Sequence, residues 1–185
     1  MKTKRISFSD RIWHMFQKEE YARARKLLLD NLKKSKKRDN HWLLCRISTT
    51  YYEERKYRTA IDYVNKARKL APHCPLVLWD YATTLDMLEH EREAIAIWKN
   101  LLRRGAKRIA FGECGEGLKR AKGLMLDCHY RLALTHRDLK KYRQAQYYMI
   151  KHINGRYPGN GSIYTLKEAR SKLNQIYDLS QKAKR

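Results

Sequence analysis

The sequence contains few residues that interrupt helices. Only three prolines and eight glycines occur in 185 residues, and no segment shows the two-residue alternation of a half-buried strand. Proline inside a helix or a central strand removes a backbone hydrogen bond, so a chain this poor in proline can hold long uninterrupted helices. These absences exclude proline-rich chains and argue against an all-β domain. The composition predicts one all-α domain, long enough to bury an apolar core.

The sequence also gives no support for a membrane protein, a secreted protein or a metal-binding protein. No apolar run approaches the roughly 18 residues that a membrane span needs. The N-terminal basic residues are not followed by the apolar core of a secretory signal. The four cysteines form no C-x-x-C pair, and no histidine pair completes a zinc-ligand spacing. We therefore expect a protein of the reducing cytoplasm, with no membrane span, no metal and no cofactor.

Motifs of enzymes are missing as well. The chain has no glycine-rich phosphate loop, no nucleophile elbow and no paired-carboxylate pattern, and its seven histidines are scattered. The sequence thus predicts a protein that is not an enzyme.

Acidic residues are scarce compared with basic ones. The chain has 19 Asp and Glu against 42 Lys and Arg, a net charge of +23. This excess of positive charge indicates binding to nucleic acid, to an acidic partner or to an anionic surface. A solvated surface that aids solubility explains the excess equally well. By contrast, no Lys or Arg lies between Leu70 and Glu91, a window that carries Asp80 and Asp86. The basic clusters lie at Lys33–Arg38, Arg103–Arg108, Arg137–Arg143 and Lys182–Arg185.

What the chain does have is an internal repeat. The segment Tyr57–Ile61 is followed 34 positions later by the similar segment Glu91–Ile95, and weaker copies begin at Tyr21 and Tyr142. A period of 34 residues is typical of arrays of helical hairpins. Two antiparallel helices pack closely only where each offers a small residue at the crossing. The small residues that keep the phase are Ser48, Ala82 and Ala133 on first helices and Ala60, Ala94 and Ala145 on second helices.

This pattern resembles the tetratricopeptide repeat (TPR) family, whose motif reads W-x2-L-G-x2-Y, then A-x3-F, then P. The best copy here reads Leu44-x2-Ile47-Ser48-x2-Tyr51, then Ala60-x3-Val64, then Pro72; the other copies depart further from the motif, and only Pro158, one place late, recurs as its proline. The resemblance implies a right-handed superhelix of hairpins. We expect a single domain with hairpins at 7–38, 41–71, 75–104 and 118–153 (its first helix extended), a glycine-rich insertion at 105–117, and a capping helix at 162–181.

In this family the first helices of successive hairpins line a concave groove that holds a partner segment. The resemblance therefore implies a noncatalytic protein-interaction module that acts as an adaptor, scaffold or chaperone. Trp79, Tyr52 and Tyr130 would be apolar anchors, and charged residues would set the register. The candidate partner-binding residues are Arg46, Thr49, Tyr52, Trp79, Asp80, Thr83, Asp86, Tyr130, Arg131 and Leu134.

One ligand of the family is not expected here, and three questions stay open at the level of sequence. Of the carboxylate clamp that some TPR proteins use to hold acidic chaperone tails, only Arg131 is present, so that ligand is rejected. RNA or ribosome binding through basic outer surfaces is the alternative function. The insertion could hold an anion or expose Cys114, or it could let the long helix pack across the end of the groove or add a contact to a partner. Neither the partner nor the oligomeric state can be read from the sequence.

Overall fold

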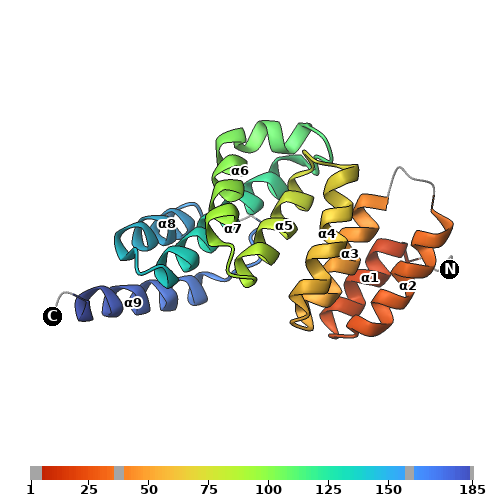
Figure 1. Cartoon of the computed structure of the whole chain (residues 1–185). Coiled ribbons are helices and arrows are strands. Elements are labelled where there is room, and N and C mark those ends of the chain that lie inside the picture. Colours follow the sequence, from red (N-terminus) through yellow and green to blue (C-terminus); the bar gives the residue numbers. More distant parts are fainter. Residues whose placement is uncertain (1–5, 36–39, 157–160, 184–185) are drawn as a thin grey trace, which may run out of the picture. The chain divides into compact units, whose positions relative to one another are not determined.

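The computed structural model describes residues 6–35, 40–156 and 161–183, and every regular element in these ranges is an α-helix (Figure 1). The predicted all-α class is confirmed. Pro158, Lys36–Arg38 and the last two residues of the basic C-terminus lie outside the described ranges.

The helices group into two compact units, Met1–Pro72 and His73–Arg185, where the sequence predicts a single domain. Apolar side chains gather in separate clusters in each unit, with Leu28 and Ile47 in the first and Met149 and Ile176 in the second. Each unit therefore has a core of its own. The first unit contains α1 (Phe8–Gln17), α2 (Tyr21–Lys34), α3 (Asn40–Glu53) and α4 (Tyr57–Leu70). The second contains α5 (Pro75–Met87), α6 (Glu91–Phe111), α7 (Gly117–Asp138), α8 (Tyr142–Asn154) and α9 (Leu166–Lys182).

Successive helices form antiparallel hairpins whose crossings use the small residues of the repeat. Ser48 and Ala60 are buried where α3 packs on α4, and the Ser48 hydroxyl donates a 2.7 Å hydrogen bond to the Ala60 carbonyl oxygen. Ala82, Ala94, Ala133 and Ala145 are all completely buried at the equivalent positions. The predicted role of the small residues is confirmed, and the hairpins are TPR-like.

The turns inside the hairpins repeat one backbone conformation. One residue in each turn has a positive φ, between 56 and 64°, and the amide after it donates to the carbonyl five positions earlier at 2.8–3.0 Å. This arrangement is the Schellman motif that ends many helices. None of these positions is glycine, so the sequence gives little sign of the shared turn. The positive-φ residues are Glu19, Arg55, Glu89 and Lys140.

The insertion is more regular than the sequence predicts. After a kink at Gly105, where φ is 74° and ψ is 161°, the chain continues as helix to Phe111. Ile109 and Ala110 are buried in this stretch, and they pack with Ala121 and other residues of α7. This burial stabilises the helical turn, so irregular backbone is confined to Gly105 and to residues 112–117, where Gly117 has a φ of 83°.

The chain closes the second unit with α9. Ala169 and Ile176 are completely buried against Ala133 and Met149, so this helix covers the apolar side of the α7–α8 hairpin. The Thr165 hydroxyl caps the helix by accepting a hydrogen bond from the Glu168 amide at 3.1 Å. A terminal helix of this kind shields the last hairpin of a repeat array from water.

Candidate functional site

Two predicted partner-binding residues in the second unit bind each other. Asp86 near the end of α5 accepts a 2.5 Å hydrogen bond from an Arg131 guanidinium nitrogen on α7, and each side chain is only 12% exposed. The Thr135 hydroxyl donates to the other carboxylate oxygen at 2.8 Å. The same guanidinium lies 3.9 Å from the Met87 sulfur. These contacts fix the last turn of α5 against α7.

Burial and pairing act in opposite directions on Asp86. Burial raises the pKa of its carboxyl, whereas the Arg131 charge and the Thr135 hydroxyl lower it. Arg131 also lies over the buried Trp98 ring, with its guanidinium carbon 5.7 Å from the ring centroid. The Arg131 guanidinium is therefore held between the Asp86 carboxylate and the Trp98 ring. This fixed ion pair lies beside Met87, which is exposed on the same face.

Trp79 is half-buried and contributes to an apolar cluster of the insertion. It packs against Ile109, Ala121 and their neighbours, and its ring centroid lies 6.3 Å from that of Trp98. Much of the Trp79 surface is thus used for packing between adjacent helices. Replacing Trp79 would disturb this cluster as well as any partner contact.

The remaining predicted residues of α5 and α7 are partly engaged within the chain. Thr83 is 8% exposed, and its hydroxyl donates to the Trp79 carbonyl oxygen at 2.8 Å. Asp80 is half-buried, and Leu134 packs against the cluster under α9. Met87, at 38% exposure, is the large apolar side chain of α5 with the highest exposed fraction.

Tyr130 lies in the core of the second unit. It is 1% exposed, its ring stacks on Tyr164 with centroids 3.8 Å apart, and its hydroxyl donates to Glu168 at 2.7 Å. Burial, and then the Glu168 hydrogen bond, raise the pKa of the Tyr130 phenol. The segment before α9 therefore covers this position, which the sequence assigned to a partner.

Asp127, which the sequence did not single out as a contact, holds that covering segment. Its carboxylate accepts hydrogen bonds from the Ser162 hydroxyl at 2.5 Å and from the Ile163 amide at 3.2 Å. Burial raises the pKa of Asp127 to about 6, although both hydrogen bonds oppose the shift. The backbones also approach closely, because a Cβ on Gly123 would lie 2.4 Å from the Gly161 carbonyl oxygen.

The predicted residues of the first unit lie on α3. Thr49 donates to the Cys45 carbonyl oxygen at 2.9 Å, Tyr52 packs edge-on to Tyr57 with centroids 5.3 Å apart, and Arg46 is half-buried. These three residues share one helix.

A largely buried ion pair of this unit involves a residue that the sequence analysis missed. Arg25 on α2 binds Glu54 at 2.9 Å and lies 4.2 Å from the centroid of the Tyr51 ring, which stacks on Tyr63. Because its neighbours lie at the end of α3 and in the turn after it, no local motif marks Arg25.

Comparison with known proteins gives a likeness to solved structures. No family model and no curated protein matches the sequence. Among solved structures, the chain is similar to the C-terminal part of a TPR repeat-containing protein from Cytophaga hutchinsonii. The identity is 18%, the match covers 93% of this chain and 72% of that chain, and the TM-score is 0.45. Within the described ranges, no helix has the length and apolar character needed to cross a membrane.

Proposed function

We propose that the protein is a noncatalytic interaction module, an adaptor, scaffold or chaperone, that binds a segment of another protein on the α5–α7 face of its second unit. The observation that carries the proposal is the exposed Met87 beside the locked pair of Asp86 and Arg131. A flexible apolar side chain can adapt to a partner, and because the polar groups beside it are already ordered, binding has to immobilise only the methionine.

Charge supports a protein partner at this face. The helix α5 carries two aspartates and neither lysine nor arginine, although the chain as a whole has a net charge of +23. A polyanion needs basic side chains that follow its backbone, so it would be repelled from α5. A partner segment that is apolar, with polar or basic flanks, matches the face.

The test is capture from cell lysate followed by affinity measurement on the identified polypeptide. Met87→Glu places a charge on the proposed face, and Ile150→Glu is the matched control, because Met87 is 38% exposed and Ile150 on α8 is 36% exposed. We expect Met87→Glu to weaken binding at least tenfold and Ile150→Glu to leave it unchanged. Equal affinities for both variants and the unmodified chain would refute the proposed face.

A specific feature of α8 supports nucleic acid as the second candidate. Arg143, Tyr147 and Lys151 recur every four residues and are all exposed, with the Lys151 nitrogen 5.5 Å from the Tyr147 ring centroid. Basic and aromatic side chains on one helix face can contact phosphates and stack on bases. Captured material that disappears with nuclease, and binding that falls steeply with salt, would favour this function. Loss of that binding in Tyr147→Ala, with Met87→Glu unaffected, would assign it to α8.

A further inference from the structure

The insertion between the third and fourth hairpins places one cysteine near the start of α5. Gly105 turns the chain, and residues Ala106–Phe111 form a helical stretch whose Ile109 and Ala110 are buried. That stretch packs in the cluster that includes Trp79 of α5. The loop that follows therefore lies near the N-terminal end of α5, where Cys74 is the residue before the first helical turn.

The loop itself is held in one tight conformation. The Gly115 amide donates to the Gly112 carbonyl oxygen at 3.0 Å, and between them Cys114 adopts a φ of 56°. A Cβ on Gly115 would lie 2.3 Å from the Ala110 carbonyl oxygen, so only glycine fits there without a shift of the backbone. Close backbone packing thus fixes where the Cys114 side chain points.

The backbone next to Cys74 is anchored as well. Arg104 on α6 donates a 2.7 Å hydrogen bond to the carbonyl oxygen of His73, the residue before Cys74. Cys74 is 1% exposed, whereas Cys114 is partly exposed to solvent. Both cysteines belong to the second unit, so the packing of that unit alone sets their separation.

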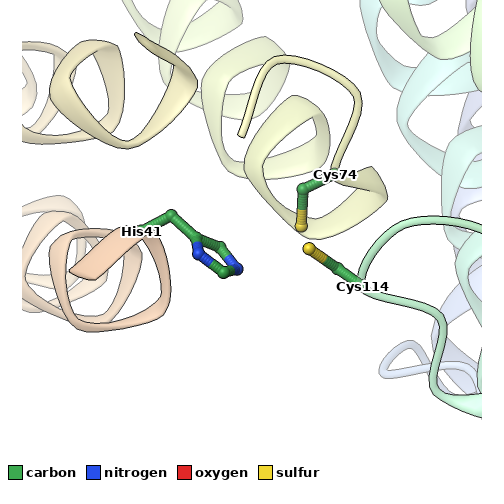
Figure 2. A group of neighbouring side chains, drawn as sticks. All are labelled: His41, Cys74 and Cys114. Atoms are coloured by element: carbon green, nitrogen blue, oxygen red, sulfur yellow. The ribbon is translucent and has the colours of Figure 1, made fainter. Parts of the chain in front are cut away.

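The two thiols face each other. Figure 2 shows their sulfur atoms directed toward one another, and the sulfurs lie within 4.8 Å, in hydrogen-bonding contact. A disulfide needs the sulfurs about 2.05 Å apart, so the loop has to move by less than about 3 Å to close the bond. The other cysteines, Cys45 and Cys128, are buried within helices.

We propose that Cys74 and Cys114 form a redox-active dithiol, a covalent site for low-molecular-weight disulfides of the glutathione type. Oxidation ties the loop before α7 to the residue that precedes α5, and reduction releases it. The cysteine that moves lies in the glycine-rich loop of residues 112–116, and the sulfur of this loop's only thiol lies within 4.8 Å of the Cys74 sulfur.

The chemistry balances without a metal or any other reactant. The Cys114 thiolate attacks one sulfur of the small disulfide RSSR, forming a mixed disulfide and releasing RS⁻, which takes up the thiol proton. The sulfur of Cys74 then attacks the Cys114 sulfur and expels the second RS⁻, which is protonated by the Cys74 proton. The two cysteines lose two electrons, and RSSR is reduced to two RSH.

The experiment equilibrates the full chain with reduced and oxidised glutathione, traps free thiols with an alkylating reagent, and maps products by peptide mass spectrometry. We expect one intramolecular product, Cys74–Cys114, in the folded protein. The same equilibrium in urea should give an effective concentration at least about tenfold lower, because flexible chains of this kind reach only the millimolar range. Circular dichroism of each sample establishes whether the chain is folded.

Variants separate the pair from the other thiols. Cys128→Ala should form the same product as the unmodified chain, and Cys114→Ser should form none. Glutathione attached to Cys114 alone would refute the dithiol. So would four free thiols in the folded protein under conditions that oxidise the urea-unfolded chain, or a disulfide between any other two cysteines. The measurement on the unmodified chain decides the matter even if a variant fails to fold.

Discussion

Ser48 on α3 donates a 2.7 Å hydrogen bond to the Ala60 carbonyl oxygen on α4, where the two helices pack against each other. Both residues are buried, and both stand at phases that repeat along the chain. Ser48 therefore has two roles. Its small size permits the two helices to cross, and its hydroxyl satisfies a backbone carbonyl at that crossing.

Substitutions at Ser48 should therefore separate size from hydrogen bonding. Ser48→Ala keeps the crossing and loses one hydrogen bond, so we expect a loss of about 1 kcal/mol in the free energy of unfolding. Ser48→Leu inserts bulk between two packed helices and should cost about 1–3 kcal/mol or more. Urea denaturation followed by circular dichroism measures both. A leucine variant as stable as the alanine variant would contradict the crossing.

Breaking the pair of Asp86 and Arg131 should strongly destabilise the second unit. Asp86→Ala leaves the guanidinium without its partner in a site where each side chain is 12% exposed, and we expect a cost of about 3 kcal/mol. Replacing both residues, as Asp86→Leu with Arg131→Met, removes the unpaired charge. The double variant should be more stable than Asp86→Ala, which a double-mutant comparison of urea midpoints can test.

Acid should destabilise the fold through a buried histidine. His136 is 5% exposed and stacks parallel to Tyr148 at 5.4 Å, and burial, with Lys99 and Lys141 contributing, lowers its pKa from 6.5 to about 4. Between these values the unfolded chain binds the proton more readily, so stability falls as pH falls from 6.5 to 4. His136→Phe should reduce this loss by about 2 kcal/mol in urea titrations at pH 7 and pH 4. An unchanged pH dependence would contradict the assignment.

Asp127 should act in the opposite direction. Its pKa is raised from 3.8 to about 6, so the folded state takes up a proton first as pH falls, and this group adds stability between pH 6 and 3.8. Asp127→Asn keeps an oxygen acceptor for Ser162 and Ile163 but removes the titration. The unmodified chain should gain about 2 kcal/mol relative to the variant between pH 7 and pH 4. Parallel stability curves for the two proteins would disprove this.

The position of Cys114 should depend on Gly115. In Gly115→Ala the new methyl group would meet the Ala110 carbonyl oxygen at 2.3 Å, so the loop must shift. We expect the effective concentration of the Cys74–Cys114 pair to fall at least about tenfold in the glutathione equilibrium. Gly161→Ala is the control, because its Cβ would meet only the Lys119 carbonyl oxygen, at 3.9 Å. If both variants behave alike, loop geometry does not govern the pair.

Much of the candidate site could not be predicted from the sequence. Helical periodicity predicts Trp79, Asp86 and Arg131 as partner-binding residues, because it identifies residues on related faces of α5 and α7. It does not show that Asp86 and Arg131 bind each other, nor that Tyr130 is covered by Tyr164. Those outcomes depend on how far one helix slides along its neighbour and on where the segment before α9 lies.

The repeat alone determined the hairpins, since the spacing of small and apolar residues along a helix dictates which faces can meet and how closely. It also determined that Ala60, Ala94 and Ala145 would be buried at the crossings. Only the tertiary structure decided the rest: two separate cores, a helical insertion after Gly105, and the meeting of Cys74 with Cys114. These features join residues far apart in the chain, and they follow from backbone turns and burial that no local spacing records.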